Sequence, residues 1–289
     1  MSAPVSIVIV NYKSCSLLYN CLQSLHGDPF EVWVVDNDSE ESLSRLRSDF
    51  PAVRWILNPQ NVGFAKAVNQ ALRVASGKYF LLLNPDTRVE PGAVRRMADF
   101  LDAHPEVGIV GGNVAGFDGQ HERASHRSIP TPQTAFYRLS GLSRLFPKHP
   151  VFGRYNWNEW DANTGAFVEA VSGSCMMLRR TMLDQIGLLD ETFFLYGEDL
   201  DLCYRAGQHH WTIYYLSEAR ISHLKGGSRR RNRMRAHYEF YRAMAIFHRK
   251  HFAPSCGPLL NSLIYAGILS RALLTCPIAL LSVIARKNL

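Results

Sequence analysis

Residues 77–87, GKYFLLLNPDT, contain five consecutive apolar or aromatic residues and then stop at Asn84-Pro85-Asp86. A run of this kind that ends in turn residues is typical of a strand buried on both faces of a parallel sheet. Asp86 then lies at the carboxyl end of the strand, which is the edge of an open α/β sheet where ligands bind. We therefore predict that this segment brings a carboxylate to a metal or sugar site.

Strand-like and helix-like segments alternate around this run through the first half of the chain. The predicted strands cover residues 5–10, 30–35, 53–57, 79–83 and 107–110. The predicted helices cover residues 16–25, 42–50, 64–75 and 91–103. This alternation predicts a Rossmann-like, doubly wound and mostly parallel α/β sheet.

The alternation breaks after the fifth predicted strand. Residues 118–163 are polar, carry prolines and aromatic residues, and show no clear period, which favours a long irregular excursion with a functional role. Regular structure then returns. We predict strands at residues 166–171, 175–178 and 212–216, and helices at residues 181–186, 198–206 and 236–252.

The bulk composition restricts the partners and the compartment. The 289 residues carry a formal net charge of +7, which favours anionic partners such as phosphates, nucleotides or anionic lipid. The basic residues are local and no nucleic-acid recognition motif accompanies them, so we predict no nucleic-acid partner. Six scattered cysteines form no CxxC pair and no signal-peptide pattern precedes the first strand, so we expect reduced core cysteines and a cytoplasmic location.

Residues 258–284 form a segment that is long and apolar enough to resemble a membrane span. On a helix, however, a narrow polar face emerges, made of Arg271, Thr275 and Ser282 and flanked by Asn261 and Tyr265. A helix or helix pair lying in the membrane interface therefore fits better than a span. Packing on the protein itself or an oligomer contact is the alternative.

Polar residues follow several predicted strands where the carboxyl edge of the sheet should lie, and Lys66 lies in the first turn of the helix after Gly63. A nucleotide needs such groups, because amides and carboxylates read base and ribose while backbone N–H groups and a cation meet phosphate. The alternative is that these side chains cap helices. The residues are Asn11, Asp36, Asp38, Asn61 and Asp86.

Asp86 is a candidate ligand of Mg²⁺ or Mn²⁺, because hard cations that bind phosphates often take only one or two protein carboxylates. His223 is a candidate partner, since the glycines at 226 and 227 suggest close backbone approach to a ligand. A structural role is the alternative for a lone histidine.

Acidic residues crowd residues 190–202, around the start of a predicted helix. Negative charge there complements the helix dipole, which is the simplest explanation. Aromatic residues at 193, 194 and 196 would also place a dry wall beside Asp199, a setting suited to a general base. Arg205 could orient one of the acids.

Seven segments carry a family resemblance. In chain order they are VSIVIVNYKS, VWVVDNDS, NVGFAKAVN, LLLNPDT, VSGSCMMLRR, FFLYGEDLDLCYR and HLKGGS. Over roughly residues 4–250 the chain resembles the inverting nucleotide-sugar glycosyltransferases of family 2, which have the GT-A fold. It is most similar to bacterial rhamnosyltransferases of cell-wall and O-antigen assembly, which use dTDP-L-rhamnose.

For the donor site, the resemblance implies that Asn11 and Tyr12 belong to the first nucleotide loop and that Asp36 reads the pyrimidine base. It also implies roles near the nucleotide for Asn61, Gly63 and Lys66.

For the chemistry, the resemblance implies that Asp86 is the last acid of the DxD metal motif, with Asn84 replacing the first acid. Asp199 matches the catalytic base, with Glu198 beside it, and His223 matches a histidine that often joins the metal. Residues 172–174 lie where such enzymes approach the acceptor and the donor sugar.

The resulting prediction is a glycosyltransferase domain over residues 1–252, with a nucleotide half (1–115) and an acceptor half (116–252), and an apolar helical tail over 253–289 that associates with membrane or an oligomer. The expected acceptor is a polyprenyl-diphosphate-linked sugar or glycan at the inner face of the cell membrane, and a homo-oligomer stays open. A UDP-sugar donor and a non-catalytic nucleotide-sugar or glycan binder are the alternatives. A nucleotidyltransferase is disfavoured, because the loop after the first strand, Asn11-Tyr12-Lys13-Ser14, has no glycine.

Overall fold

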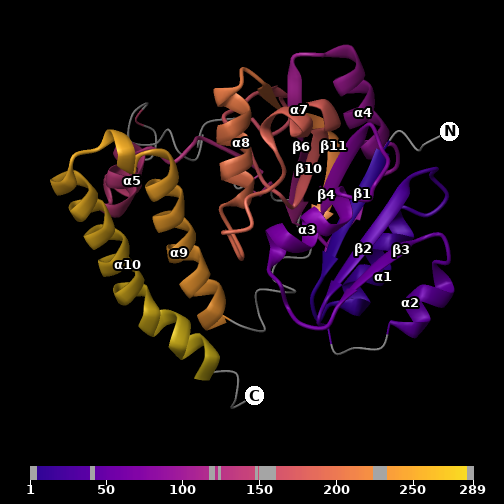
Figure 1. Cartoon of the computed structure of the whole chain (residues 1–289), viewed down its shortest axis with the longest axis horizontal. Coiled ribbons are helices and arrows are strands. Elements are labelled where there is room, and N and C mark those ends of the chain that lie inside the picture. Colours follow the sequence, from indigo (N-terminus) through magenta and orange to yellow (C-terminus); the bar gives the residue numbers. More distant parts are fainter. Residues whose placement is uncertain are drawn as a thin grey trace.

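The computed structural model of the chain describes residues 5–39, 43–116, 121–122, 125–146, 149, 161–223 and 233–284. Figure 1 shows a central twisted sheet covered by helices on both faces, with the last two long helices set to one side. The described chain begins with a strand of the sheet and ends with the second of those two helices.

The central sheet has nine strands, and eight of them follow the order β3-β2-β1-β4-β10-β6-β11-β5. Strands β1, β2, β3 and β4 are parallel, as are β6 and β11. Strand β10 runs antiparallel between β4 and β6, β5 and β8 pair antiparallel with β11, and β7 and β9 form a separate two-stranded sheet. The strands are β1 (Val5–Asn11), β2 (Glu31–Asn37), β3 (Arg54–Asn58), β4 (Tyr79–Leu83), β5 (Thr87–Val89), β6 (Val107–Gly116), β7 (His126–Arg127), β8 (Ala166–Phe167), β9 (Ala170–Val171), β10 (Cys175–Arg179) and β11 (Thr212–His223).

The described helices fall into those that connect the strands and those that follow the sheet. They are α1 (Cys15–Ser24), α2 (Ser44–Asp49), α3 (Phe64–Leu72), α4 (Ala93–Ala103), α5 (Pro132–Leu139), α6 (Leu142–Leu145), α7 (Arg180–Ile186), α8 (Glu198–Gln208), α9 (Arg233–His251) and α10 (Pro258–Ile284), with a 3-10 turn, η2 (Ala253–Ser255), between the last two.

Strand β4 shows why the sheet is buried on both faces. Its side chains alternate, so Phe80 and Leu82 join the core beneath α3, α7 and α8, while Tyr79, Leu81 and Leu83 join the core beneath α1 and α4. All five are nearly inaccessible to solvent. The uninterrupted apolar run therefore forms the centre of a three-layer α/β domain, which confirms the predicted fold class.

Several details of the predicted secondary structure were wrong, among them the strand predicted at residues 212–216, which continues to His223. Residues 118–163 were predicted to be irregular, but their described part contains two helices, α5 and α6. These helices were missed because they are short and their apolar spacing is weak. Residues 166–171 form two short strands instead of one, and the strand predicted at 107–110 continues to Gly116. The three-residue strand β5, directly after Asp86, was missed because so short a strand carries little pattern of its own.

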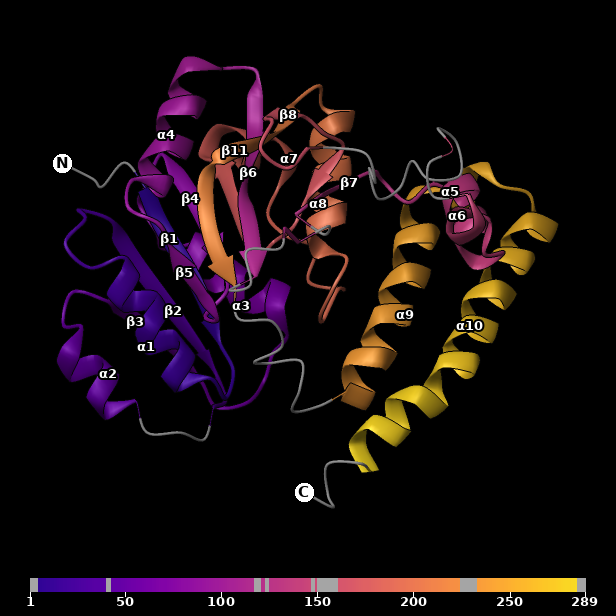
Figure 2. The ribbon, with the colours of Figure 1, turned by 180° about the vertical axis from the view of Figure 1, so that it is seen from behind.

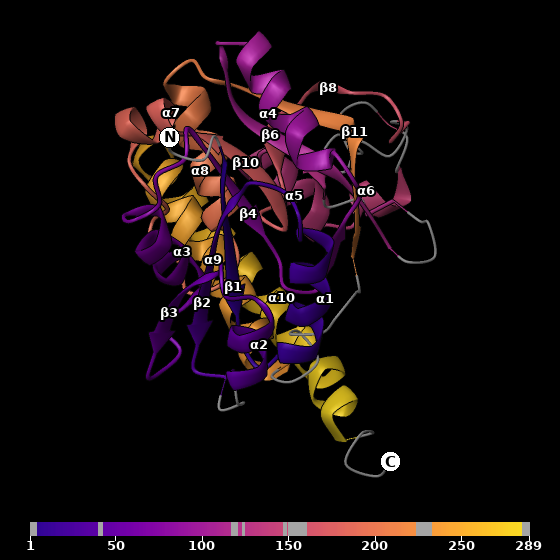
Figure 3. The same ribbon diagram turned by 90° about the vertical axis from the view of Figure 1, so that its right-hand side faces the viewer.

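Helix α10 is a single 27-residue helix, not a helix pair. It packs beside α9, and Figure 3 shows its last turns extending beyond the rest of the molecule. Thr275 Oγ1 lies 2.9 Å from both His237 Nε2 and Tyr241 OH on α9, and Asn261 Oδ1 lies 2.8 Å from His248 Nε2. Thr275 and Asn261 therefore point toward α9, whereas Arg271 is exposed.

The opposite face of α10 is apolar and exposed. The leucines at 259, 263, 269, 273 and 274 are each more than 60% exposed. The first nineteen residues of this helix are long and apolar enough to cross a membrane by length and composition, and only 6% of that window is buried. The side chain of Ser282 lies outside the described part of the chain.

Candidate active site

The loop after β1 and the end of β2 are joined by a buried polar cluster. Asn11 is fully buried, and its amide donates to Asp36 Oδ1 and to Ser39 Oγ, each at 2.8 Å. Ser14 Oγ donates to Asn11 Oδ1 at 2.9 Å. Asn11 therefore fixes the carboxylate of Asp36, while Tyr12 beside it is partly exposed.

A second polar cluster holds the loop between β3 and α3. Asn37 Nδ2 donates to Asn61 Oδ1 at 2.9 Å, and Asn37 Oδ1 accepts from Val62 N at 3.0 Å. Asn61 Oδ1 also accepts from Gly63 N at 3.0 Å. Asn61 is thus an organiser of this loop, and Asn37 is the buried residue that ties it to β2.

Gly63 begins α3 with a φ of +91°, a conformation that favours glycine. A Cβ at this position would lie 2.9 Å from the backbone oxygen of Phe194, which also accepts from Phe64 N at 2.7 Å. Residues 63 and 194 are therefore in backbone contact. Lys66, in the first turn of α3, is exposed, and its charge acts on Glu191.

Asp86 and His223 meet, as the sequence predicts, across 137 positions of chain. His223 Nε2 lies 3.0 Å from Asp86 Oδ1, and its other ring nitrogen, Nδ1, lies 3.0 Å from Glu122 Oε1. Burial alone would lower the pKa of His223, but the hydrogen bonds to the two carboxylates outweigh it and raise the pKa to about 9. The glycines at 226 and 227 lie outside the described residues.

The pair formed by Asp86 and His223 fits a hard divalent cation. Two ligand atoms at right angles on such a cation, with bonds of about 2.1 Å, lie about 3 Å apart. Asp86 Oδ1 and His223 Nε2 have this separation. Within the described residues no group of three or more His, Cys, Asp or Glu side chains has the geometry of a metal site, so a bound diphosphate would have to supply the other ligands. Asn84 contributes a backbone contact, its N–H donating to Ser174 O at 3.1 Å.

Asp199 lies in the first turn of α8 and is held from three sides. Its Oδ2 accepts from Arg127 Nη2 and from Gly173 N, the latter at 3.2 Å, and its Oδ1 accepts from Leu200 N at 2.7 Å. Its side chain is 12% exposed. A carboxylate fixed in this way, with limited access to solvent, can receive a proton from a hydroxyl that enters the site.

Glu198, the neighbour of Asp199, has a different environment. Its side chain is buried, and Oε2 has no hydrogen-bond partner among the described residues. Burial and then the nearby charge of Asp199 raise the pKa of Glu198 to about 8. The two adjacent acids are therefore unlike, with Glu198 neutral at pH 7.

The turn at residues 172–174 connects the two clusters. Its Gly173 N–H donates to Asp199, and its Ser174 carbonyl accepts from the N–H of Asn84, two residues before Asp86. The buried strand β4 thus ends, and helix α8 begins, beside the same short turn. The turn therefore links Asp199 to the segment that carries Asp86.

Other acids in residues 190–202 are structural. Arg205 Nε donates to Asp201 Oδ2 at 2.8 Å, which confirms that Arg205 orients one acid of the segment. Asp201 is fully buried and also pairs with Lys250 and His251 of α9. Although burial opposes it, these hydrogen bonds lower the pKa of Asp201 to about 2.

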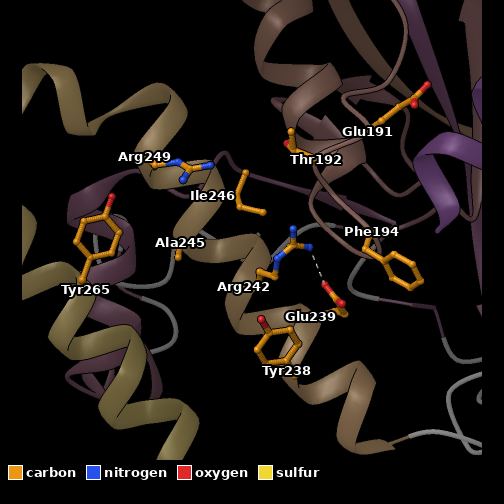
Figure 4. Close-up of a pocket in the computed structure, with 10 residues that line it drawn as sticks. All are labelled: Glu191, Thr192, Phe194, Tyr238, Glu239, Arg242, Ala245, Ile246, Arg249 and Tyr265. Atoms are coloured by element: carbon orange, nitrogen blue, oxygen red, sulfur yellow. Dashed lines mark hydrogen bonds and ion pairs between the residues drawn. The ribbon is translucent and has the colours of Figure 1, made fainter. Parts of the chain in front are cut away.

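A cavity of about 860 Å³ lies apart from these clusters, between α9, α10 and the loop before α8 (Figure 4). The polar side chains that line it are largely paired, as Arg242 is with Glu239 at 3.0 Å. Neither Asp86 nor Asp199 lines it. Its lining includes Phe194, which lies against Gly63, and Glu191, which bonds to Asn69 and Arg73.

Four residues of these clusters were missed from the sequence. Ser39 and Asn37 stand in the DNDS segment, next to Asp36, and could have been found there. Glu122 and Arg127 lie in or beside the stretch that showed no period, and only their tertiary contacts single them out.

Comparison with known proteins bears on what this arrangement does. The family model described as "Glycosyl transferase family 2" matches residues 6–187. An N-acetylglucosaminyl-diphospho-decaprenol L-rhamnosyltransferase of Mycobacterium tuberculosis is 25% identical over 243 residues, which span 79% of this chain and 78% of that protein. The low-salt glycan biosynthesis hexosyltransferase Agl10 of Haloferax volcanii is 28% identical over 213 residues, spanning 72% and 63%.

Solved structures show the same fold at lower identity. S. aureus TarS 1–349 in complex with UDP-GlcNAc is similar with a TM-score of 0.59 at 19% identity, over 94% of this chain and 72% of that one. The mannosyltransferase PcManGT of Pyrobaculum calidifontis, in complex with GDP-Man and Mn²⁺, is similar with a TM-score of 0.56 at 14% identity, over 100% and 76%. With the fold, the family model and these relatives in agreement, the chain is a glycosyltransferase with the GT-A fold and belongs to glycosyl transferase family 2.

Proposed function

We propose that this glycosyltransferase moves L-rhamnose from dTDP-L-rhamnose to a hydroxyl of a lipid-linked or growing cell-surface glycan, with inversion at the anomeric carbon. The observation that carries the proposal is the turn at residues 172–174, which contacts both Asp199 and the Asn84-Pro85-Asp86 segment. A base for the acceptor and a site for the donor diphosphate are thereby brought to one edge of the sheet.

The proposed reaction is a single displacement. Asp199 takes the proton of the acceptor hydroxyl as its oxygen bonds to the anomeric carbon, while the bond from that carbon to the diphosphate oxygen breaks. The nucleoside diphosphate leaves with the bonding electron pair. Asp86 and His223 would hold Mg²⁺ or Mn²⁺, whose charge offsets that of the leaving group. Arg127 and the Gly173 N–H keep the Asp199 carboxylate in place.

The proposed donor site is the pair of polar clusters at the ends of β1, β2 and β3. Asp36 would read the pyrimidine base, while Tyr12, Asn61, Gly63, Lys66 and Asn84 would lie around the nucleotide. Dinucleotide- and nucleotide-binding sheets place their ligands at this edge, which supports the assignment. The name of the mycobacterial relative favours rhamnose, whereas the UDP-GlcNAc complex of TarS supports a UDP-sugar as the second candidate.

A membrane surface is the proposed location of the acceptor. Helix α10 turns Asn261 and Thr275 toward α9 and leaves its leucines in solvent, the reverse of a helix in a water-soluble core. An exposed apolar stripe on a protein of net charge +7 suits the headgroup region of an anionic membrane. Together they favour the inner face of the cell membrane and a polyprenyl-diphosphate-linked acceptor.

A thermal-shift panel of nucleotide sugars, with and without Mn²⁺, tests the donor. We expect dTDP-L-rhamnose to raise the melting temperature, and to do so more with Mn²⁺, because a ligand that binds only the folded state stabilises it. If only UDP-sugars raise the melting temperature, the donor is a UDP-sugar and not dTDP-L-rhamnose. Stabilisation without any transfer or donor hydrolysis would favour a non-catalytic binder.

A further inference from the structure

Glu122 is the third side chain of the cluster around His223. Its Oε1 lies 3.0 Å from His223 Nδ1, on the opposite side of the ring from Asp86. All three side chains are largely buried: 8% of Asp86 and 13% each of His223 and Glu122 are exposed. The imidazole of His223 is therefore hydrogen-bonded at both ring nitrogens, in a site with little access to water.

The sheet explains this arrangement. His223 is the last residue of β11, where it pairs with Thr87 of β5 on one side and with Gly116 of β6 on the other. Asp86 directly precedes Thr87, so it reaches the ring from the β5 side. Figure 2 shows the end of β11 running down beside β5 and β6.

Glu122 comes from the β6 side and is anchored there by its backbone. Its N–H donates to Val114 O of β6 at 2.9 Å, and its carbonyl accepts from Ser125 N at 2.8 Å. The preceding residue, His121, forms a β-bridge with Ala115. The carboxylate of Glu122 is thus placed by the rigid end of a central strand.

The chemistry of a metal-bound imidazole gives this carboxylate a role. One ring nitrogen must be deprotonated to bind a cation, and the other then carries the proton. A carboxylate that accepts this second N–H fixes the tautomer and the ring orientation and makes the ligand nitrogen more basic. Glu122 faces Nδ1, which leaves Nε2 as the nitrogen on the side of Asp86.

We propose that Glu122 is a positioning residue of the cation site: it accepts the Nδ1–H of His223 and so presents Nε2, together with Asp86, to Mg²⁺ or Mn²⁺. The inference rests on the proposed function, in which Asp86 and His223 hold the cation. It adds a residue that touches neither donor nor acceptor but sets the affinity of the site for its metal.

Mn²⁺ affinity of the full chain, measured by electron paramagnetic resonance with and without dTDP, tests the proposal. Glu122→Leu removes the acceptor, and we expect Mn²⁺ to bind 10- to 100-fold more weakly, the usual cost of losing such a partner. Glu122→Gln keeps an oxygen that accepts Nδ1–H and should recover most of the affinity. Glu169→Leu is the matched control, because Glu169 is also partly buried but accepts a hydrogen bond from the backbone N–H of Ile129.

The outcomes separate this inference from the proposed function. If Asp86→Asn and His223→Ala weaken Mn²⁺ binding but Glu122→Leu does not, the cation site stands and the role of Glu122 is wrong. If the wild type binds no Mn²⁺ with dTDP, or if Asp86→Asn and His223→Ala bind Mn²⁺ normally, both the proposed cation site and the role of Glu122 are wrong.

A measurement on the wild type keeps the test independent of folding of the variants. The ¹⁵N shifts of the His223 ring, in the complex with Mg²⁺ and dTDP, should identify Nδ1 as the protonated nitrogen and Nε2 as the metal ligand. The opposite assignment would overturn the proposal.

Discussion

At the scale of the residue, the two neighbouring acids at the start of α8 lie in different environments. Asp199 is fixed by Arg127, Gly173 and its own helix, whereas Glu198 is buried with an oxygen that has no partner in the described chain. Burial and the nearby charge of Asp199 raise the pKa of Glu198 to about 8, which favours its neutral form. This difference in environment supports the proposal that Asp199 is the base.

We expect Asp199→Asn to reduce transfer about 10²- to 10⁴-fold, the usual contribution of a general base, because the amide cannot take a proton. Donor binding, measured as a thermal shift, should be retained. Asp190→Asn is the control, since Asp190 lies in the same acidic segment but pairs with Lys250. Near-normal turnover of Asp199→Asn would show that the base lies elsewhere.

Glu198 should make stability depend on pH. Its pKa in the folded protein is about 8, above its ordinary value of 4.5, so the folded state binds the extra proton between these values. The stabilising effect of the neutral form is complete below pH 4.5 and is lost as the pH rises toward 8.

A glutamine resembles the neutral, protonated form of Glu198 and cannot ionise. Glu198→Gln should therefore remove the loss of stability that accompanies a rise in pH. Relative to the wild type it should gain stability between about pH 5 and pH 8, on the order of 1 kcal/mol or more, as measured by urea unfolding. Transfer should persist within about tenfold, since Asp199 is intact and the change removes no proton acceptor. Parallel pH profiles for the two proteins would contradict this account.

At the scale of the element, the proposed donor site is formed by loops that buried asparagine side chains tie to the strands. Asn37 at the end of β2 holds the loop before α3, and Asn11 at the end of β1 holds Asp36. The start of α3 is also tied to the segment before α8 through residues 63 and 194. A change at this contact should therefore alter donor binding as well as stability.

Gly63→Ala tests that contact against a matched control. Gly63 and Gly27 have similar positive φ angles, +91° and +95°, but a methyl group added at Gly63 would meet atoms of Phe194 at 2.9 Å, whereas one added at Gly27 would meet none within 4 Å. Gly27→Ala should show the backbone strain alone, about 1–2 kcal/mol. Gly63→Ala should lose more stability in urea unfolding and should weaken the thermal shift with donor. Equal effects of the two substitutions would show that the contact with Phe194 is unimportant.

At the scale of the whole molecule, the α/β domain and the α9–α10 pair present different surfaces. Figures 1 and 2 show the helix pair beside the sheet layers, with α10 outermost. At 27 residues α10 is about 40 Å long, and its outer face is rich in leucine. A long apolar ridge on one side of the enzyme would dock the whole molecule on a membrane.

Leu263→Asp with Leu274→Asp should shift the enzyme from liposomes to the soluble fraction in a sedimentation assay. Each leucine moved into apolar surroundings contributes about 1.5–3 kcal/mol, so binding should fall at least tenfold. Deletion after Phe252 should have the same effect. Leu57→Asp is the control, because Leu57 is 53% exposed but lies on β3, far along the sheet from α10. Unchanged sedimentation of the double variant would exclude α10 as the membrane contact.

The local patterns of the sequence determined the layered α/β fold and most of its elements. An uninterrupted apolar run such as residues 79–83 is typical of a strand whose two faces are both buried. Such a strand can therefore be predicted from the local sequence alone. The apolar run at residues 175–178 looks similar, and nothing in it reveals that its strand lies antiparallel between β4 and β6. Strand direction is set by the path of the connections, which is a property of the whole chain.

The same limit applies to the candidate site. Asp86, His223 and Asp199 stand in segments with strong local patterns, and the sequence alone singled them out. Glu122 and Arg127 stand where no pattern exists, and only tertiary structure brings them within hydrogen-bonding distance of His223 and Asp199. The packing of α10 against α9 likewise decides that Asn261 and Thr275 face the protein. Periodicity encodes which residues are buried in one element, whereas pairing between distant residues depends on how the elements pack.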